Sequence, residues 1–262
     1  MKKFDIRSLT YGGLMTALVF VATAIIPRIP VPFTQGYIHT GDSMIFVTAI
    51  LFGWKHGAIA GGLGSALADL YGYPQWAIPT LIIKGIMGAL VGFVSHDLRK
   101  SNKSITAIIN TVIIGIWLAF GVTIRNFFND KLGNLANSEL ANKLITDMGL
   151  KGTKELSSLV SLVNNSLLVS IILIPVMAIL VYIILRKGNK EAFSLSSIMG
   201  MTVAGLWMVI GYYIAGSFLL GNIVVPLFSI PANLLQFVGG AIIAFIVVIA
   251  LRKTRYFKNF NN

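Results

Sequence analysis

The sequence predicts an all-α integral membrane protein, and three observations carry that prediction: the composition, the long apolar segments and the placement of the positive charges. Of the 262 residues, 56% are hydrophobic and only 11% are charged. A typical soluble domain is about a quarter charged, so this chain has too few charged side chains to cover a surface that faces water. Backbone N–H and C=O groups in lipid must hydrogen-bond within their own segment, so the long apolar segments are predicted to be helices.

Eight apolar segments are candidate helices of this protein. They cover approximately residues 9–26, 42–54, 57–71, 76–96, 105–124, 166–185, 197–219 and 232–251. A helix needs about 20 residues to cross the hydrocarbon core, so the second and third segments are too short to cross it alone. We expect these two, which are rich in glycine, to form a buried or partly re-entrant pair inside the bundle.

The positive charges predict the orientation in the membrane. The net charge is +12. If the N-terminus is cytoplasmic and every segment crosses once, fourteen of the 21 Lys and Arg residues fall on the cytoplasmic side and six on the outer side, with Lys84 inside a segment. Cytoplasmic loops carry such an excess. We therefore expect a multi-pass protein of the cell membrane with both termini in the cytoplasm, and no nucleic-acid partner.

The outer loop at about residues 126–165 is the longest polar stretch. Its apolar residues recur every three or four positions, at Leu132, Leu135, Ala136, Leu140, Leu144 and Met148, which is typical of an amphipathic helix. Two interpretations remain open. The segment could form a lid over an outward-facing cavity, or it could rest on the lipid headgroups.

Three ionisable residues lie within the segments, where a charge costs about 2.5 to 3.5 kcal/mol on insertion scales. Asp42 could cap the second helix through its carboxylate. Asp69 and Lys84 could form an ion pair with each other, or they could face a ligand. Each of the three is therefore a candidate for either a structural or a functional role.

Two uncharged amides lie near the start of the last segment. Asn233 and Gln236 are three residues apart and share one helical face. Together they offer two carbonyl acceptors and four N–H donors, a set that suits a neutral heteroaromatic ring. The alternative is a hydrogen bond between helices.

Aromatic residues and prolines gather near the predicted outer ends of the segments. The aromatic residues are Phe33, Tyr37, Tyr71, Tyr73, Trp76, Tyr212 and Tyr213. Some belong to an interfacial belt, and those on loops could stack on a planar ligand. Proline makes the loops at 27–33 and 225–231 stiff, so we expect both loops to cover one cavity.

Motifs for catalysis are missing from the sequence. The chain has no cysteine, and its three histidines, His39, His56 and His96, are scattered. It also lacks a Walker A loop, a zinc-protease motif and a nucleophile elbow. We expect neither an enzyme nor a resident metal or cofactor.

Several blocks of sequence together resemble the substrate-binding S component of energy-coupling factor (ECF) vitamin transporters, in the hydroxymethylpyrimidine-type branch. The blocks are GYIHTGDS at 36–43, GGLGSALADL at 61–70, PTLIIKG at 79–85, GYY at 211–213 and PANLLQ at 231–236. The resemblance covers residues 8 to about 100 and 197 to 252. It implies a six-helix core, and the apolar segments within residues 104–190 add about two further transmembrane helices between core helices 4 and 5.

The resemblance and the departure from it divide the chain into three parts within one membrane domain. Residues 1–103 hold core helices 1 to 4, and residues 104–190 hold the inserted helix pair with its amphipathic segment. Residues 191–262 hold core helices 5 and 6 and a basic tail. This insertion departs from the six-helix pattern of the family.

The resemblance also implies a pocket, partners and a function. The pocket residues it points to, together with the aromatic candidates above, are Tyr37, His39, Asp69, Tyr71, Trp76, Lys84, Tyr212, Asn233 and Gln236. The small residues Gly13 and Ala17 on the first helix match a motif that docks on the transmembrane coupling subunit. The protein would capture a small planar vitamin or precursor, while two ATPase subunits use ATP to drive its uptake. The rival hypothesis is a stand-alone secondary transporter with Asp69 and Lys84 as an ion relay.

Overall fold

The computed structural model describes residues 6–31, 36–96, 103–133, 139–187 and 195–254. Its α-helices are α1 (Ile6–Ala24), α2 (Gly41–Phe52), α3 (Trp54–Gly72), α4 (Ala77–His96), α5 (Lys103–Leu132), α6 (Glu139–Met148), α7 (Thr153–Lys187), α8 (Leu195–Leu219) and α9 (Ile230–Arg252). Two short 3₁₀ helices, η2 (Pro74–Trp76) and η4 (Val225–Ser229), precede α4 and α9. Strands β1 (Ile29–Val31) and β2 (Gly36–Ile38) form an antiparallel pair.

The all-α membrane fold is confirmed. Each of the eight predicted apolar segments falls on a helix, and the described residues contain six helices long and apolar enough to cross a bilayer. These six are α1, α4, α5, α7, α8 and α9. Helix α2 is apolar, short and mostly buried in the bundle, as predicted. Helix α3 is longer than predicted, with 19 residues. It packs on α1, α2 and α4 but leaves Leu63, Leu67 and Leu70 exposed on its outer face, so it is not buried as expected.

The bundle of α1 to α4 with α8 and α9 depends on close backbone contact. A Cβ atom on Gly88 of α4 would collide with the carbonyl group of Gly57 in α3. Such small residues let two helices approach without side chains between them, which is how helices associate when lipid removes the hydrophobic drive. The tight contact fixes the relative position of α3 and α4, whose adjoining ends carry part of the pocket described below.

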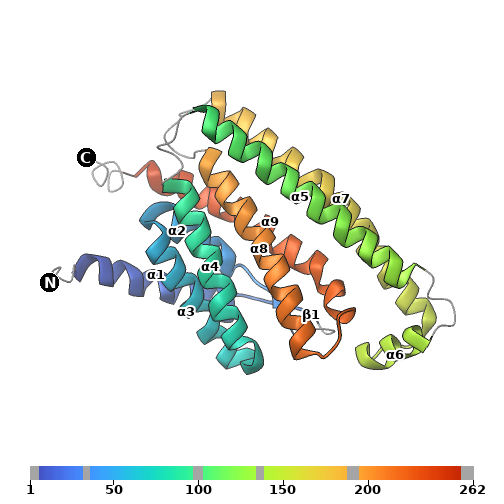
Figure 1. Ribbon diagram of the computed structural model, residues 1–262. Coiled ribbons are helices and arrows are strands. Elements are labelled where there is room, and N and C mark those ends of the chain that lie inside the picture. Colours follow the sequence, from blue (N-terminus) through green and yellow to red (C-terminus); the bar gives the residue numbers. More distant parts are fainter. Residues whose placement is uncertain (1–5, 32–35, 97–102, 134–138, 188–194, 255–262) are drawn as a thin grey trace.

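Helices α5 and α7 run side by side along one flank of this bundle (Figure 1). Both are longer than predicted, with 30 and 35 residues. Residues 126–132 continue α5, and residues 153–165 belong to α7. Apolar residues recur at helical spacing in both stretches, so the two helix ends pack against each other. The expected outer loop at 126–165 is therefore largely helical, and only α6 and its connections lie between the two long helices.

The amphipathic segment is present as α6, but its apolar face is covered by protein. Ala141, Leu144 and Met148 are buried in one cluster with Phe128 and Leu132 of α5. A helix that rests on headgroups would leave this face to lipid. The three-part division of the chain at 104 and 190 stays a prediction, and the basic tail at 255–262 lies outside the described residues.

The β1–β2 hairpin comes from the first proline-rich loop. Ile29 pairs with Ile38, and Pro30 pairs with Tyr37. Prolines fix φ and favour extended backbone in the residue before them, so this loop is a stiff ribbon rather than a helix. The hairpin brings Tyr37 and His39 against the ends of α3, α8 and α9. Phe33 lies outside the described residues.

Candidate functional site

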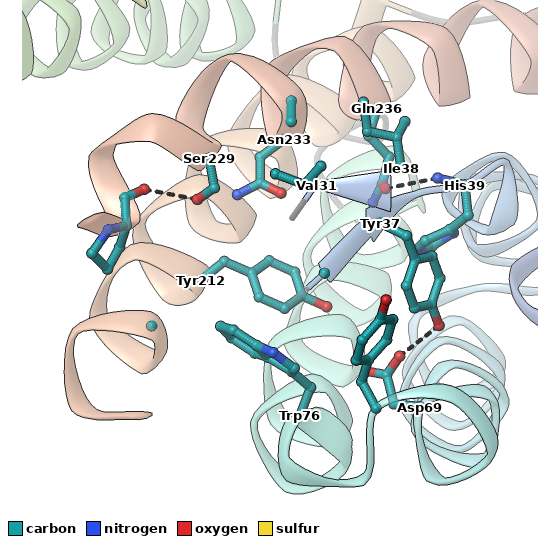
Figure 2. A pocket seen from close by; sticks show the side chains of 15 residues that line it. Val31, Tyr37, Ile38, His39, Asp69, Trp76, Tyr212, Ser229, Asn233 and Gln236 are labelled. Carbon is teal, nitrogen blue, oxygen red and sulfur yellow. Dashed lines mark hydrogen bonds between the residues drawn. The ribbon is translucent and has the colours of Figure 1, made fainter. Parts of the chain in front are cut away.

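The main candidate site is a pocket between the hairpin, the end of α3 with η2, the end of α8, and η4 with the start of α9 (Figure 2). Its cavity volume is about 60 Å³, smaller than is typical of small-molecule sites. Its lining comprises Val31, Gly36, Tyr37, Ile38, His39, Asp69, Tyr73, Trp76, Tyr212, Gly216, Pro226, Ser229, Ala232, Asn233 and Gln236. Both proline-rich loops contribute, as predicted, through Val31 and Pro226.

Two aromatic pairs form the sides of the pocket. The rings of Tyr37 and Tyr73 stack with centroids 5.5 Å apart. On the other side, Trp76 and Tyr212 lie 5.7 Å apart at a tilt. The hydroxyl of Tyr212 is 3.1 Å from Thr80 Oγ1, which fixes the ring. Such rings provide flat apolar surfaces on which a planar ligand can stack.

Asp69 is the acidic group of the pocket. The Tyr37 hydroxyl donates a hydrogen bond to Asp69 Oδ1 at 2.7 Å. Burial, and then the nearby negative charge of Asp69, raise the pKa of the Tyr37 hydroxyl, so it stays a protonated donor. Among the described residues no cation lies within ion-pair distance of Asp69. The guanidinium of Arg28 instead lies over the Tyr37 ring, 4.6 Å from its centroid.

The predicted roles of Asp42 and Lys84 are both corrected by the structure. Lys84 Nζ donates to Asp42 Oδ1 at 2.5 Å, and both side chains are fully buried. The expected Asp69–Lys84 pair is therefore wrong. Asp42 does not cap α2 either, since the start of that helix has no side-chain cap. The carboxylate turns inward, because Lys84 offers it a stronger partner than backbone N–H groups do.

Gln236 connects this ion pair to the pocket. Its Nε2 donates to Asp42 Oδ2 at 3.1 Å, and its Oε1 accepts from the backbone N–H of His39 at 3.0 Å. The amide is thus oriented by a charged group on one side and holds the end of the hairpin on the other. Gln236 is a bridge between elements, one of the two interpretations that the sequence leaves open.

Lys84 lies behind the aromatic side of the pocket rather than in its lining. Its ammonium is 5.4 Å from the Tyr212 ring centroid and 3.0 Å from Met208 Sδ. A buried charge needs partners on all sides, and Lys84 has a carboxylate, a sulfur atom and a ring face. Its position gives it no direct access to a ligand in this structure.

His39 is a neutral donor at the pocket. Its Nδ1 accepts from the backbone N–H of Gly41 at 3.0 Å, and burial lowers the pKa of the imidazole to about 3. A neutral imidazole whose Nδ1 accepts must carry its proton on Nε2. The loop before α2 therefore presents an N–H group at position 39.

Asn233 lies in the pocket lining, whereas Tyr71 does not. Asn233 lines the pocket, and within the described residues its amide has no hydrogen-bond partner. Tyr71 is 78% exposed and lies outside the lining. Placing Tyr71 in the pocket wall is wrong because the last turn of α3 points Asp69 inward and Tyr71, two positions later, away from it.

Several residues of the pocket lining were not predicted from the sequence. Gly216 and Ser229 carry no distinctive chemistry and lie outside the quoted sequence blocks, and Ala232 lies in the block at 231–236 but has no polar or aromatic group. Gly216 matters by its size, because a Cβ there would lie 3.2 Å from Pro226 and 3.5 Å from Trp76. Helical spacing from Tyr212 to Gly216 was the one signal that could have found it.

A second, apolar groove lies on the outside of the bundle between α1 and α3. It is lined by Gly13, Thr16, Ala17, Phe20, Leu67, Leu70 and Tyr71. Gly13 and Ala17 are both exposed, and nothing lies within 4 Å of a Cβ placed on Gly13. Within the described residues, no group of three or more His, Asp or Glu side chains is placed to hold a metal ion.

Comparison with known proteins identifies a family. Residues 3–152 and 156–253 match the family described as "ECF-type riboflavin transporter, S component". The match includes α5 to α7, and it does not confirm the narrower resemblance to the hydroxymethylpyrimidine-type branch.

Two similar curated proteins carry little functional information. An uncharacterized protein of Pyrococcus woesei is 46% identical over 99 residues, which are 38% of this chain and 65% of that protein. A UPF0397 protein of an Exiguobacterium species is 28% identical over 108 residues, which are 40% and 57% of the two chains. The aligned regions span less than two thirds of each relative.

Proposed function

The chain belongs to the family of ECF-type riboflavin transporter S components, and from this premise we propose that it captures a small planar vitamin or vitamin precursor for uptake driven by other subunits. The observation that carries the proposal is the pocket between the hairpin and η4, with two aromatic pairs, an acid and an amide that has no hydrogen-bond partner among the described residues. A multi-pass membrane protein with such a site is suited to binding rather than to catalysis.

The proposed ligand contacts divide into stacking and hydrogen bonding. The rings of Tyr37, Trp76 and Tyr212 provide apolar faces for a planar ring system. Asn233 offers an acceptor and two donors, and His39 Nε2–H offers a further donor. Asp69 adds a carboxylate oxygen for a ligand N–H or O–H group. This mixture favours an uncharged heteroaromatic compound with polar edges, such as riboflavin or hydroxymethylpyrimidine.

The network behind the pocket supports this role. Gln236 holds the backbone of His39 on one side and Asp42 on the other, and Lys84 neutralises Asp42. The end of the hairpin is therefore tied to α2, α4 and α9. Such pre-organisation reduces the ordering that a ligand must otherwise impose.

Uptake itself is assigned to partner subunits. We propose that the α1–α3 groove with Gly13 and Ala17 is the docking face for a transmembrane coupling subunit, and that two cytoplasmic ATPase subunits supply the energy. Hydrolysis would reorient the S component in the bilayer and carry the closed pocket inward. The orientation proposed from the lysine and arginine distribution places both termini in the cytoplasm and the pocket at the outer face.

The ion-relay alternative has no support in the pocket. A relay of Asp69 and Lys84 would require the two groups to exchange a proton or an ion along a path. Lys84 is instead bonded to Asp42 and fully buried.

Ligand capture can be tested by extraction and titration. The protein is purified in detergent, denatured, and its supernatant examined by mass spectrometry for a bound heteroaromatic compound. The ligand-free protein is then titrated with riboflavin and with hydroxymethylpyrimidine by calorimetry. Saturable binding of either, or of the extracted compound, is expected. An empty protein that binds none of these would contradict the proposal.

A further inference from the structure

One wall of the pocket is supported from outside the six-helix bundle. The η4 segment provides Pro226 and Ser229 to the pocket. Behind it, Phe228 meets the ring of Phe128 from α5, with centroids 5.8 Å apart and planes at 68°. Phe128 is fully buried and Phe228 is 5% exposed. The wall therefore rests on a side chain that belongs to the α5–α7 part of the chain.

A polar contact adds a second support at the other end of η4. Asn222 Nδ2 donates to Asp147 Oδ2 of α6 at 3.1 Å. The same side chain accepts, through Oδ1, the backbone N–H of Val224 at 2.8 Å and of Val225 at 3.3 Å. These N–H groups open η4, so Asn222 joins the last turn of α6 directly to the first turn of the pocket wall.

Helix α6 is itself fixed in place. Its Leu144 is fully buried, in one cluster with Leu132 of α5 and Leu156 of α7. Farther along the long helices, Arg125 Nε donates to Asn164 Oδ1 at 3.1 Å and joins α5 to α7. The hydrogen bond between Asn222 and Asp147 thus connects the well-packed helix α6 to the short 3₁₀ helix η4.

We infer that the outer ends of α5 and α7, together with α6, hold η4 in position and so set how far the pocket is closed. Asp147, Asn222 and Phe128 are positioning residues in this arrangement, since each acts on the pocket through η4. The inference deepens the proposed function, because the wall matters for binding only if the pocket is the ligand site. It assigns α6 a role as a fixed support and not as a lid.

The test uses thiol reporters in a chain that has no cysteine of its own. One reporter is the substitution Ser229→Cys, on η4. The second is Val31→Cys, which lies on β1 and also lines the pocket. The rate at which a methanethiosulfonate reagent modifies each reporter is measured in purified, ligand-free protein. Local opening of η4 raises the first rate alone, whereas general loosening raises both.

Variants of Asp147 then separate the effect of the hydrogen bond from the effect of the negative charge. Asp147→Ala removes the acceptor and is expected to raise the rate at the η4 reporter about two- to tenfold, the range for one hydrogen bond. Asp147→Asn keeps a carbonyl acceptor for Asn222 and is expected to leave the rate near that of the parent. The matched control is Asp130→Ala, which removes an exposed acid near the end of α5 whose ion-pair partner is Lys131, at 3.9 Å.

A cycle with Asn222→Ala completes the experiment. In that background Asp147→Ala is expected to add no further increase, because the bond is already absent. Equal rates for Asp147→Ala and Asp130→Ala would overturn the inference, as would an equal increase at both reporters. Neither result touches the proposed function, which fails separately if extraction and titration find no ligand.

Discussion

At the scale of single residues, Asn233 and Gln236 separate into two roles although they share a helical face. Gln236 has both ends of its amide engaged, by His39 and by Asp42. Asn233 faces the pocket without a partner among the described residues. The spacing of the two amides along the sequence predicts that both lie near the site. What distinguishes them is the position of Asp42, which is 194 residues away from Gln236 in the sequence.

Substituting these two amides is expected to give different results. Asn233→Ala should weaken ligand binding by about 1 to 3 kcal/mol, because a buried polar group of the ligand loses its partner, and should leave the melting temperature of the ligand-free protein unchanged. Gln236→Ala should lower both the affinity and the melting temperature. Calorimetry and thermal unfolding in detergent measure the two quantities. Equal behaviour of the two variants would contradict the separation of roles.

The neutral His39 predicts a dependence of stability on pH. Burial lowers its pKa to about 3, against about 6.5 in an unfolded chain. Below pH 6.5 the unfolded chain takes up a proton that the folded protein does not. The contribution of His39 is therefore complete above pH 6.5 and is lost as the pH falls from 6.5 toward 3.

Comparison with a variant isolates this contribution. In His39→Asn the side-chain oxygen can still accept the Gly41 N–H, but it does not titrate. The melting temperature should fall less between pH 7.5 and pH 5 in this variant than in the parent protein. A fall of the same size in both would show that other groups cause the dependence.

At the scale of elements, the helices were predictable and their partners were not. Hydrophobic length located all eight apolar segments, because lipid allows few alternatives to a helix. The proline content located both loops that line the pocket. The pairing of Asp42 with Lys84 was missed, since it depends on how α2 and α4 lie against each other, and no local pattern encodes that. The length of α5 was missed because its polar end packs on protein instead of facing water as a loop.

The Asp42–Lys84 ion pair joins α2 to α4. We expect the protein to lose substantial stability when this pair is broken. Lys84→Met leaves the Asp42 carboxylate buried without its cation, which typically destabilises by about 3 to 5 kcal/mol. Adding Asp42→Asn removes the unpaired charge and should restore most of the loss. Thermal unfolding of both variants measures this, with Lys55→Met as the control at an exposed lysine. If the single and double variants unfold alike, the pair contributes little.

At the scale of the whole molecule, two sites lie on separate surfaces of one bundle. The pocket is built from the hairpin, α3, α8, η4 and α9, and the apolar groove is built from α1 and α3. Helix α3 is common to both, through Asp69 in the pocket and Leu67 and Leu70 in the groove. A subunit docked in the groove would therefore contact the helix that carries the acid of the pocket.

This arrangement predicts that docking and ligand binding can be separated by one substitution. Nothing lies within 4 Å of a Cβ on Gly13, so Gly13→Leu should fold normally while it fills the groove. Co-purification of the coupling and ATPase subunits should be lost, and transport with it, whereas ligand affinity of the isolated protein should stay within about twofold of the parent. Gly115→Leu on α5, where a Cβ also meets nothing within 4 Å, is the matched control and should keep its partners. Retained partners in Gly13→Leu would exclude the α1–α3 groove as the docking face, while a joint loss of partners and of ligand affinity would mean that α3 transmits the change from one site to the other.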